Sequence, residues 1–137
     1  MRKIVCYLVG AAALLVMTSA LARAQEFKPY PGSQLDEKLS REASAVATDR
    51  ESKVYTTSDS FDKVYAFYKG LYKQDTKMPA GPKLPSGQQV QWAFFLIDGG
   101  KDLSTSKLWM KVQYPMLAGP DGKDVRNITH IQVVRKQ

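Results

Sequence analysis

The clearest periodic pattern in the chain lies between Asp59 and Lys73. Apolar side chains recur there at intervals of three and four residues, which is the spacing of one face of a helix. They are Phe61, Val64, Tyr65, Tyr68, Leu71 and Tyr72, with Phe67 at the flank. We predict an amphipathic helix over residues 60–73, with Asp59 as its N-cap and Asp62 at its third position; Ser58 and Ser60 are alternative caps.

Strand patterns surround this helix, and we predict strands at 42–48, 52–57, 90–97, 107–114 and 126–134, with a hairpin turn at 49–51. Residues 107–114 alternate most regularly. Leu108, Met110, Val112 and Tyr114 face one way, and Lys107, Trp109, Lys111 and Gln113 face the other. In the last strand, Thr129, Ile131 and Val133 are expected to point inward and His130 and Gln132 outward.

These patterns predict an α+β fold, with an antiparallel sheet of four or five strands and one main amphipathic helix packed on one face. We assign residues 42–137 to a single domain and residues 25–41 to an N-terminal arm. Within the arm, Ser33 and Asp36 fit a capping box for a short helix, but irregular chain leading into a strand fits equally. Residues 74–89 contain Pro79, Pro82 and Pro85, which predict a long loop.

The N-terminus predicts export. Met1-Arg2-Lys3 is basic, residues 4–20 are largely apolar, and Ala22-Arg23-Ala24 has the small-x-small pattern that signal peptidase cleaves. We expect residues 1–24 to be a secretory signal peptide; a cut after Ala22 and an uncleaved anchor are the alternatives. The mature protein would be periplasmic or secreted, with no membrane span. Its lack of cysteine would exclude disulfides and thiol chemistry.

The charge of the expected mature chain favours some partners over others. It has 17 Lys and Arg against 13 Asp and Glu, a net charge of +4, and residues 63–111 alone carry +5. A basic segment of this kind suits an anionic envelope component or an acidic protein. The alternative is an ordinary solvated surface. We expect no nucleic-acid partner, because the chain is exported and no binding motif is present.

Residues with catalytic or metal-binding chemistry are few. His130 is the only histidine, and the aspartates at 98, 102, 121 and 124 flank glycine-containing turns without the spacing of a calcium loop. We therefore expect no metal and no cofactor. The sequence favours a non-enzymatic protein, and a hydrolase centred on His130 is the alternative.

Two sets of residues are candidates for binding. The first is Trp109 between Lys107 and Lys111, together with Lys77 and Lys83 in the long loop, which would form a basic surface for a protein or anionic partner. This requires an open sheet face; an arm bearing Phe27 and Tyr30, or a second layer, would close it. The second set is Tyr65, Tyr68 and Tyr72, which would line a small-ligand cleft between helix and sheet.

Two blocks of sequence resemble a group of small secreted bacterial proteins that have no assigned function. One is Asp59-Ser60-x-x-Lys63-Val64-x-x-Phe67-Tyr68-Lys69; the other is Leu84-Pro85-Ser86-Gly87 followed by Trp92-Ala93-Phe94-Phe95. The resemblance implies a secreted α+β domain and supplies no catalytic residues. The function we expect is binding of a protein partner or an anionic envelope component by an exported protein, with a small-ligand carrier as the alternative.

Overall fold

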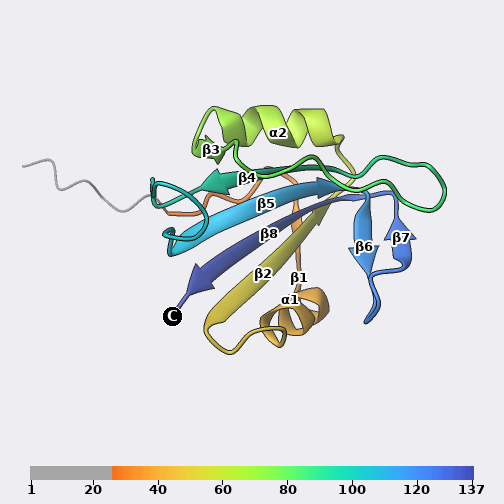
Figure 1. Ribbon diagram of the computed structural model, residues 1–137, viewed down its shortest axis with the longest axis horizontal. Helices are drawn as coiled ribbons and strands as arrows, with labels where there is room; N and C mark the ends of the chain where they lie inside the picture. The colour runs from red at the N-terminus through yellow and green to blue at the C-terminus, as the bar shows by residue number, and fades with distance from the viewer. Residues whose placement is uncertain (1–25) are drawn as a thin grey trace, which may run out of the picture.

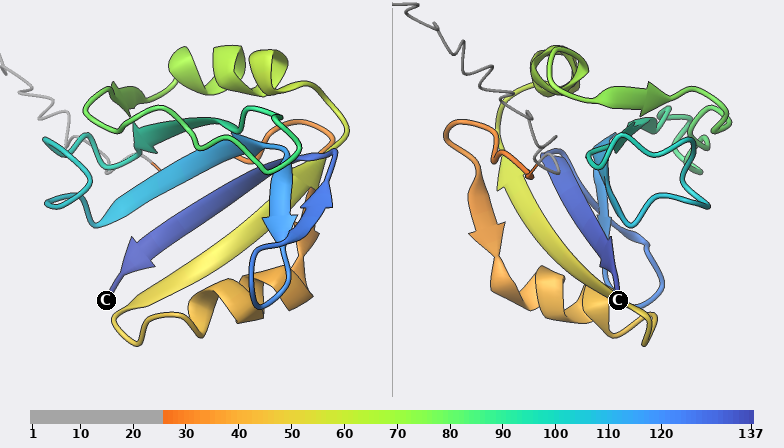
Figure 2. Two further views of the ribbon diagram at one scale, coloured as in Figure 1. Left: turned by 45° about the vertical axis from the view of Figure 1, so that its right-hand side comes forward. Right: turned by 90° about the vertical axis from the view of Figure 1, so that its left-hand side faces the viewer.

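A six-stranded antiparallel sheet in the order β1-β2-β8-β5-β4-β3 carries the fold. The computed structural model describes residues 26–137, so the predicted signal peptide lies outside the described residues. Helices α1 and α2 lie on opposite sides of the sheet (Figures 1 and 2). The elements are β1 Gln34–Asp36, α1 Glu37–Ser44, β2 Arg50–Thr57, α2 Phe61–Lys69, β3 Lys73–Asp75, β4 Gln91–Leu96, β5 Leu108–Tyr114, β6 Met116–Ala118, β7 Asp124–Arg126 and β8 Thr129–Lys136.

Helix α2 covers the first face of the sheet, as its apolar stripe predicts. Its N-cap is Ser60, whose hydroxyl accepts a hydrogen bond from the Lys63 backbone N–H. The alternative cap Ser60 is therefore confirmed and Asp59 is wrong. The Asp59 carboxylate instead accepts a hydrogen bond from the Tyr30 hydroxyl at 2.6 Å. The helix also ends at Lys69 rather than at residue 73, because residues 73–75 pair with β4 as the edge strand β3.

The core between α2 and the sheet is filled by large side chains. Tyr68, Phe95 and Met110 are fully buried there. The N-terminal arm closes the side of this core, since the Phe27 ring lies 5.2 Å from that of Tyr55 and 6.1 Å from that of Tyr68, measured between centroids. The arm is thus part of the packed structure.

The strand that we predicted over residues 42–48 is wrong. Residues 37–44 form α1, because the Asp36 carboxylate caps the helix at the Leu39 N–H and six of its eight residues (Glu, Lys, Leu, Arg, Glu and Ala) have high helix propensity. The expected turn at 49–51 is wrong as well, since Arg50 and Glu51 begin β2. Residues 34–41, which we assigned to the arm, supply β1 and part of α1.

Helix α1 completes the hydrogen bonding at the edge of β2. Strand β1 pairs only with residues 54–56, so it does not reach the first half of β2. The Ser44 hydroxyl accepts from the Ser52 N–H and donates to the Ser52 carbonyl, and the Ser40 hydroxyl accepts from the Val54 N–H. Two hydroxyls one helical turn apart therefore take the place of a neighbouring strand.

A second layer covers the other face of the sheet. It consists of α1, the hairpin β6–β7 that follows β5, and the 76–90 loop, whose Pro79 carbonyl accepts a hydrogen bond from the Trp92 indole. The α+β class is confirmed, but the sheet has six strands and the described chain two helices. No helix among residues 26–137 is long and apolar enough to span a membrane.

Replacing both Ser40 and Ser44 with alanine should lower the free energy of unfolding by on the order of 2–4 kcal/mol. The reason is that buried backbone groups of Ser52 and Val54 lose their partners, and each unpaired group costs about 1–3 kcal/mol. Urea unfolding measures the difference. Ser58→Ala, at an exposed position, is the matched control and should change stability by less than about 0.5 kcal/mol. A double variant as stable as this control would show that water replaces the hydroxyls.

Candidate functional site

The second face of the sheet carries most of its polar side chains. Residues opposite one another in an antiparallel pair share a face, so the strand register gives rows of neighbours across β4, β5, β8 and β2. One row is Trp92, Gln113, His130 and Thr56; the next is Phe94, Lys111, Gln132 and Val54; the third is Leu96, Trp109, Val134 and Ser52. Trp109, Gln132 and His130 thus lie along the middle of this face.

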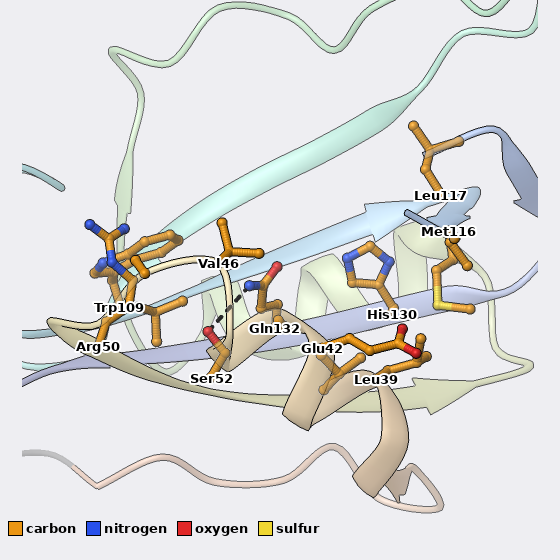
Figure 3. Close-up of a pocket in the computed structure, with 16 residues that line it drawn as sticks. Leu39, Glu42, Val46, Arg50, Ser52, Trp109, Met116, Leu117, His130 and Gln132 are labelled. Carbon is orange, nitrogen blue, oxygen red and sulfur yellow. Dashed lines mark hydrogen bonds between the residues drawn. The ribbon is translucent and has the colours of Figure 1, made fainter. Parts of the chain in front are cut away.

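These three residues line a pocket of about 340 Å³ (Figure 3). Its floor is the second face of β2, β8 and β5, one wall is α1 with the turn that follows it, and the other wall is β6. The apolar lining comes from Leu39, Val46, Val54, Met116, Leu117 and Val134, and the polar lining from Glu42, Arg50, Ser52, His130 and Gln132. The pocket is therefore mainly apolar, with a few polar groups that converge on it. Val46 is 85% exposed, so the pocket is open to solvent on the Val46 side.

Two nitrogen atoms of the pocket residues lack hydrogen-bond partners. Trp109 Nε1 and His130 Nδ1 are both buried and unpaired among the described residues. His130 as a whole is only 6% exposed. Most buried polar atoms in proteins have a partner, and the chain's other tryptophan follows that rule, since Trp92 Nε1 donates to the Pro79 carbonyl at 2.8 Å. Both unpaired atoms belong to residues that line the pocket.

The imidazole of His130 is neutral over the physiological pH range. Burial, and to a smaller extent the positive charge of Lys111, lower its pKa to about 3. Burial also lowers the pKa of Lys111, which is half-buried and forms none of the ion pairs found among residues 26–137. This side of the sheet therefore holds a cation with no counter-charge beside a neutral histidine.

His130 has no catalytic partner among the described residues. No hydroxyl or carboxylate of the described residues is hydrogen-bonded to His130, so the imidazole has neither a nucleophile to activate nor a group to orient it. The Ser52 hydroxyl is instead 3.4 Å from the amide nitrogen of Gln132. Residues 26–137 also contain no cluster of three or more His, Cys, Asp or Glu that would hold a metal ion.

The expected alternation of Lys107, Trp109 and Lys111 is confirmed, but the open basic surface is wrong. All three side chains point to the second face, where Trp109 and Lys111 are half-buried and only Lys107 is exposed. The cover is the second layer, not the arm, because Phe27 and Tyr30 pack on the first face.

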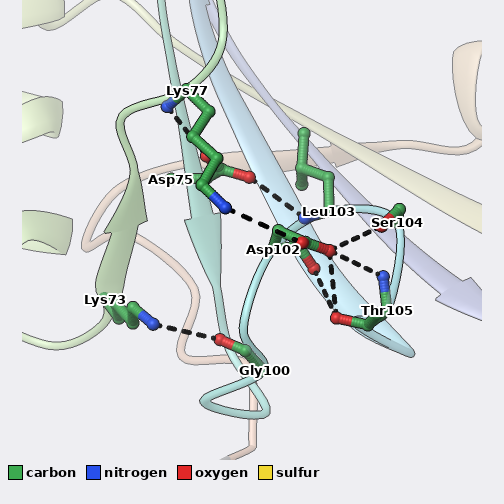
Figure 4. A network of polar contacts seen from close by, with 8 residues as sticks. All are labelled: Lys73, Asp75, Lys77, Gly100, Asp102, Leu103, Ser104 and Thr105. Atoms are coloured by element: carbon green, nitrogen blue, oxygen red, sulfur yellow. Dashed lines mark hydrogen bonds and ion pairs between the residues drawn. The ribbon is translucent and has the colours of Figure 1, made fainter.

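The two loop lysines lie away from this pocket. Lys77 pairs with Asp102 at 3.9 Å, while the buried Asp75 carboxylate accepts hydrogen bonds from the Lys77 and Leu103 N–H groups (Figure 4). Hydrogen bonds from Ser104 and Thr105 lower the pKa of Asp102 to about 2 and keep it charged for this pair. The buried Asp75 therefore links the end of β3 to the 98–107 loop, and the pair that exposed Lys77 forms with Asp102 adds little to this link. Lys83 is exposed.

The tyrosine cleft is filled by protein. The hydroxyls of Tyr65, Tyr68 and Tyr72 donate to the side chain of Gln74 and to the carbonyls of Lys28 and Glu26, respectively. Because the arm supplies two of these acceptors, none of the three hydroxyls needs a polar ligand.

The strand residues that face the pocket could be identified from the sequence, because they are the outward positions of the predicted strands 107–114 and 126–134. Glu42 and Arg50 were missed because their segment was assigned to a strand and a turn.

Replacing His130 with leucine should weaken the dependence of stability on pH. Because the folded pKa of about 3 lies below the unfolded value of about 6.5, the unfolded chain takes up the proton first, and stability falls as the pH drops through this window. Between pH 6.5 and 4.5 the wild type should lose about 2 kcal/mol more than His130→Leu. At pH 7 the variant should be at least as stable, since it removes an unpaired polar atom. Parallel stability curves would mean that His130 is protonated in the folded protein.

Comparison of the chain with protein-family models, with curated proteins and with solved structures finds no match. The case for a function therefore rests on the pocket itself. Its physical features are an apolar lining, two unpaired buried nitrogens and a nearby unpaired cation.

Proposed function

We propose that the protein is an exported, non-enzymatic binding protein that holds a small amphipathic molecule of the cell envelope in the pocket between α1, the sheet and β6. The observation that carries this proposal is the pair of buried, unpaired nitrogens on Trp109 and His130. It keeps the class of function that the sequence favours and moves the binding site from an open basic surface into a pocket.

The size and lining of the pocket support a small ligand. Its volume of about 340 Å³ falls within the range of small-molecule sites, about 300–1,000 Å³. Such sites combine mostly apolar walls with a few polar groups that fix orientation. Leu39, Val54 and Met116 supply apolar wall here, and Gln132 offers both a donor and an acceptor.

The unpaired nitrogens support a ligand with polar atoms. A buried donor without a partner destabilises the folded protein by about 1–3 kcal/mol, and a ligand acceptor that reached it would recover that energy on binding. Water does not reach either atom in this conformation. Neighbouring side chains must therefore move slightly as the ligand enters, so binding should be accompanied by local rearrangement around Trp109.

A protein partner is the second candidate. Exposed Lys83 and Lys107 favour it. However, Lys77, the other lysine of the expected basic loop, already pairs with Asp102 within the described structure, which leaves a smaller basic surface for a partner.

Binding of the fluorescent probe 1-anilinonaphthalene-8-sulfonate tests the pocket. In a Trp92→Phe background Trp109 is the only tryptophan, so energy transfer from tryptophan to the probe reports that the two are close. We expect strong transfer in this background. Adding Ala43→Phe should reduce it at least fivefold, because Ala43 lines the pocket and a larger side chain fills it.

Ala45→Phe is the matched control. Ala45 belongs to the same turn of chain but lines a different hollow, with Leu35 and Lys53. Transfer should stay within twofold of the Trp92→Phe parent, with circular dichroism confirming that all variants fold. Equal transfer in the Ala43→Phe and Ala45→Phe variants would place the probe outside the pocket and reject the proposal.

A further inference from the structure

The pocket has two chemically different ends. Figure 3 shows Arg50 and Trp109 at one end and His130 with Met116 at the other. The register agrees, because Trp109 lies opposite Val134, four residues along β8 from His130. Four strand residues span about 13 Å. The two unpaired nitrogens therefore belong to side chains attached at opposite ends of an elongated space.

The Trp109 end favours a negatively charged acceptor. An indole N–H can only donate, so its partner must be an acceptor. Arg50 adds a positive charge at this end. Within residues 26–137 its side chain pairs with Asp49 alone, at 3.2 Å from Nε, which leaves the two terminal nitrogens of the guanidinium available. A carboxylate is the acceptor that a guanidinium binds best, because both oxygens can be engaged at once.

The His130 end disfavours a second anion. Glu42 lines both this pocket and an adjoining hollow between α1 and the β6–β7 hairpin. The hollow holds three carboxylates, those of Asp36, Glu42 and Asp124, against two cations, Lys38 and Arg126, which pair with Glu42 and Asp124. Lys111, the cation that acts on His130, does not line the pocket. Helical side chains lean toward the N-terminus of their helix, and α1 runs antiparallel to β2, which directs Glu42 toward the level of His130. A neutral imidazole can donate or accept a hydrogen bond according to its tautomer, so a neutral hydroxyl suits this end.

We infer that the ligand is an unbranched carboxylate of on the order of ten carbons, with a hydroxyl at its far end. The inference rests on the proposed function. The carboxylate lies against Trp109 and Arg50, the chain crosses Val134 and Val46, and the hydroxyl meets His130. The length follows from the span of about 13 Å and the advance of about 1.2 Å per bond of an extended chain.

Three probes that share a ten-carbon chain separate the two ends. They are 10-hydroxydecanoate, decanoate and 1-decanol, each titrated against Trp109 fluorescence in the Trp92→Phe background. The dissociation constant should be at least fivefold lower for decanoate than for 1-decanol, and about fivefold lower again for 10-hydroxydecanoate, the gain expected from one net hydrogen bond.

Variants then assign each preference to its residue. Arg50→Gln should weaken both carboxylates at least fivefold and leave 1-decanol unchanged. Arg41→Gln removes the same charge from α1, outside the pocket, and should change nothing. His130→Leu should abolish the advantage of the hydroxyl while decanoate still binds.

Two results would overturn the inference. One is 1-decanol binding as tightly as decanoate, and the other is a terminal hydroxyl that weakens binding. In either case, if energy transfer to the anilinonaphthalene probe still depends on Ala43, the pocket remains a binding site and only the class of ligand is wrong. If that dependence is also absent, the proposed function fails together with the inference.

Discussion

Strand β8 is the element on which the rest of the structure depends, because it is paired on both edges and buried on both faces. It joins β2 to β5, and most of its side chains, from Thr129 to Val134, are shielded from solvent. A strand of this kind needs a cover on each side. Helix α2 and the arm cover the first face. The second face is covered by shorter pieces, α1 and β6, and the space that they leave between them is the pocket. The pocket is thus a consequence of covering one face with small elements.

The polar character of that face lowers the stability of the folded protein. An apolar set of side chains at positions 109, 111, 130 and 132 would pack against the second layer without unpaired atoms. The protein instead places there an indole N–H, an ammonium group, an imidazole and an amide. Groups that reduce stability without a structural benefit tend to occur where function requires them. Trp92 provides a contrast, because its indole N–H donates a hydrogen bond to the Pro79 carbonyl of the adjoining loop. The fold can therefore supply a partner for a tryptophan, and it does not do so for Trp109.

Much of the fold followed from residue patterns, and the errors have identifiable causes. The long elements β4, β5, β8 and α2 were located because each contains enough alternating or helical positions to define its period. Strands β1, β3, β6 and β7 have three residues each, too few for a period to be visible. Helix α1 was misassigned because small residues such as Ala43 and Ala45 fit both templates. The candidate site was predicted only in part. Alternation within the strands showed which face carries Trp109, Lys111, His130 and Gln132. The positions of Glu42 and Arg50 depend instead on where α1 and β2 begin, which the sequence did not reveal. That the face is closed depends on tertiary contacts between segments distant in sequence.

The hydroxyls of Ser40 and Ser44 have a geometrical consequence for the pocket. Four residues of helix rise about 6 Å, and two residues of strand about 6.8 Å, so one helical turn nearly matches one strand repeat. The two serines engage Val54 and Ser52, which are separated by one such repeat. Sliding α1 along β2 by a single residue would bring both hydroxyls out of step at once. The wall that carries Leu39, Ala43 and Val46 is therefore held in a fixed register with the floor of the pocket.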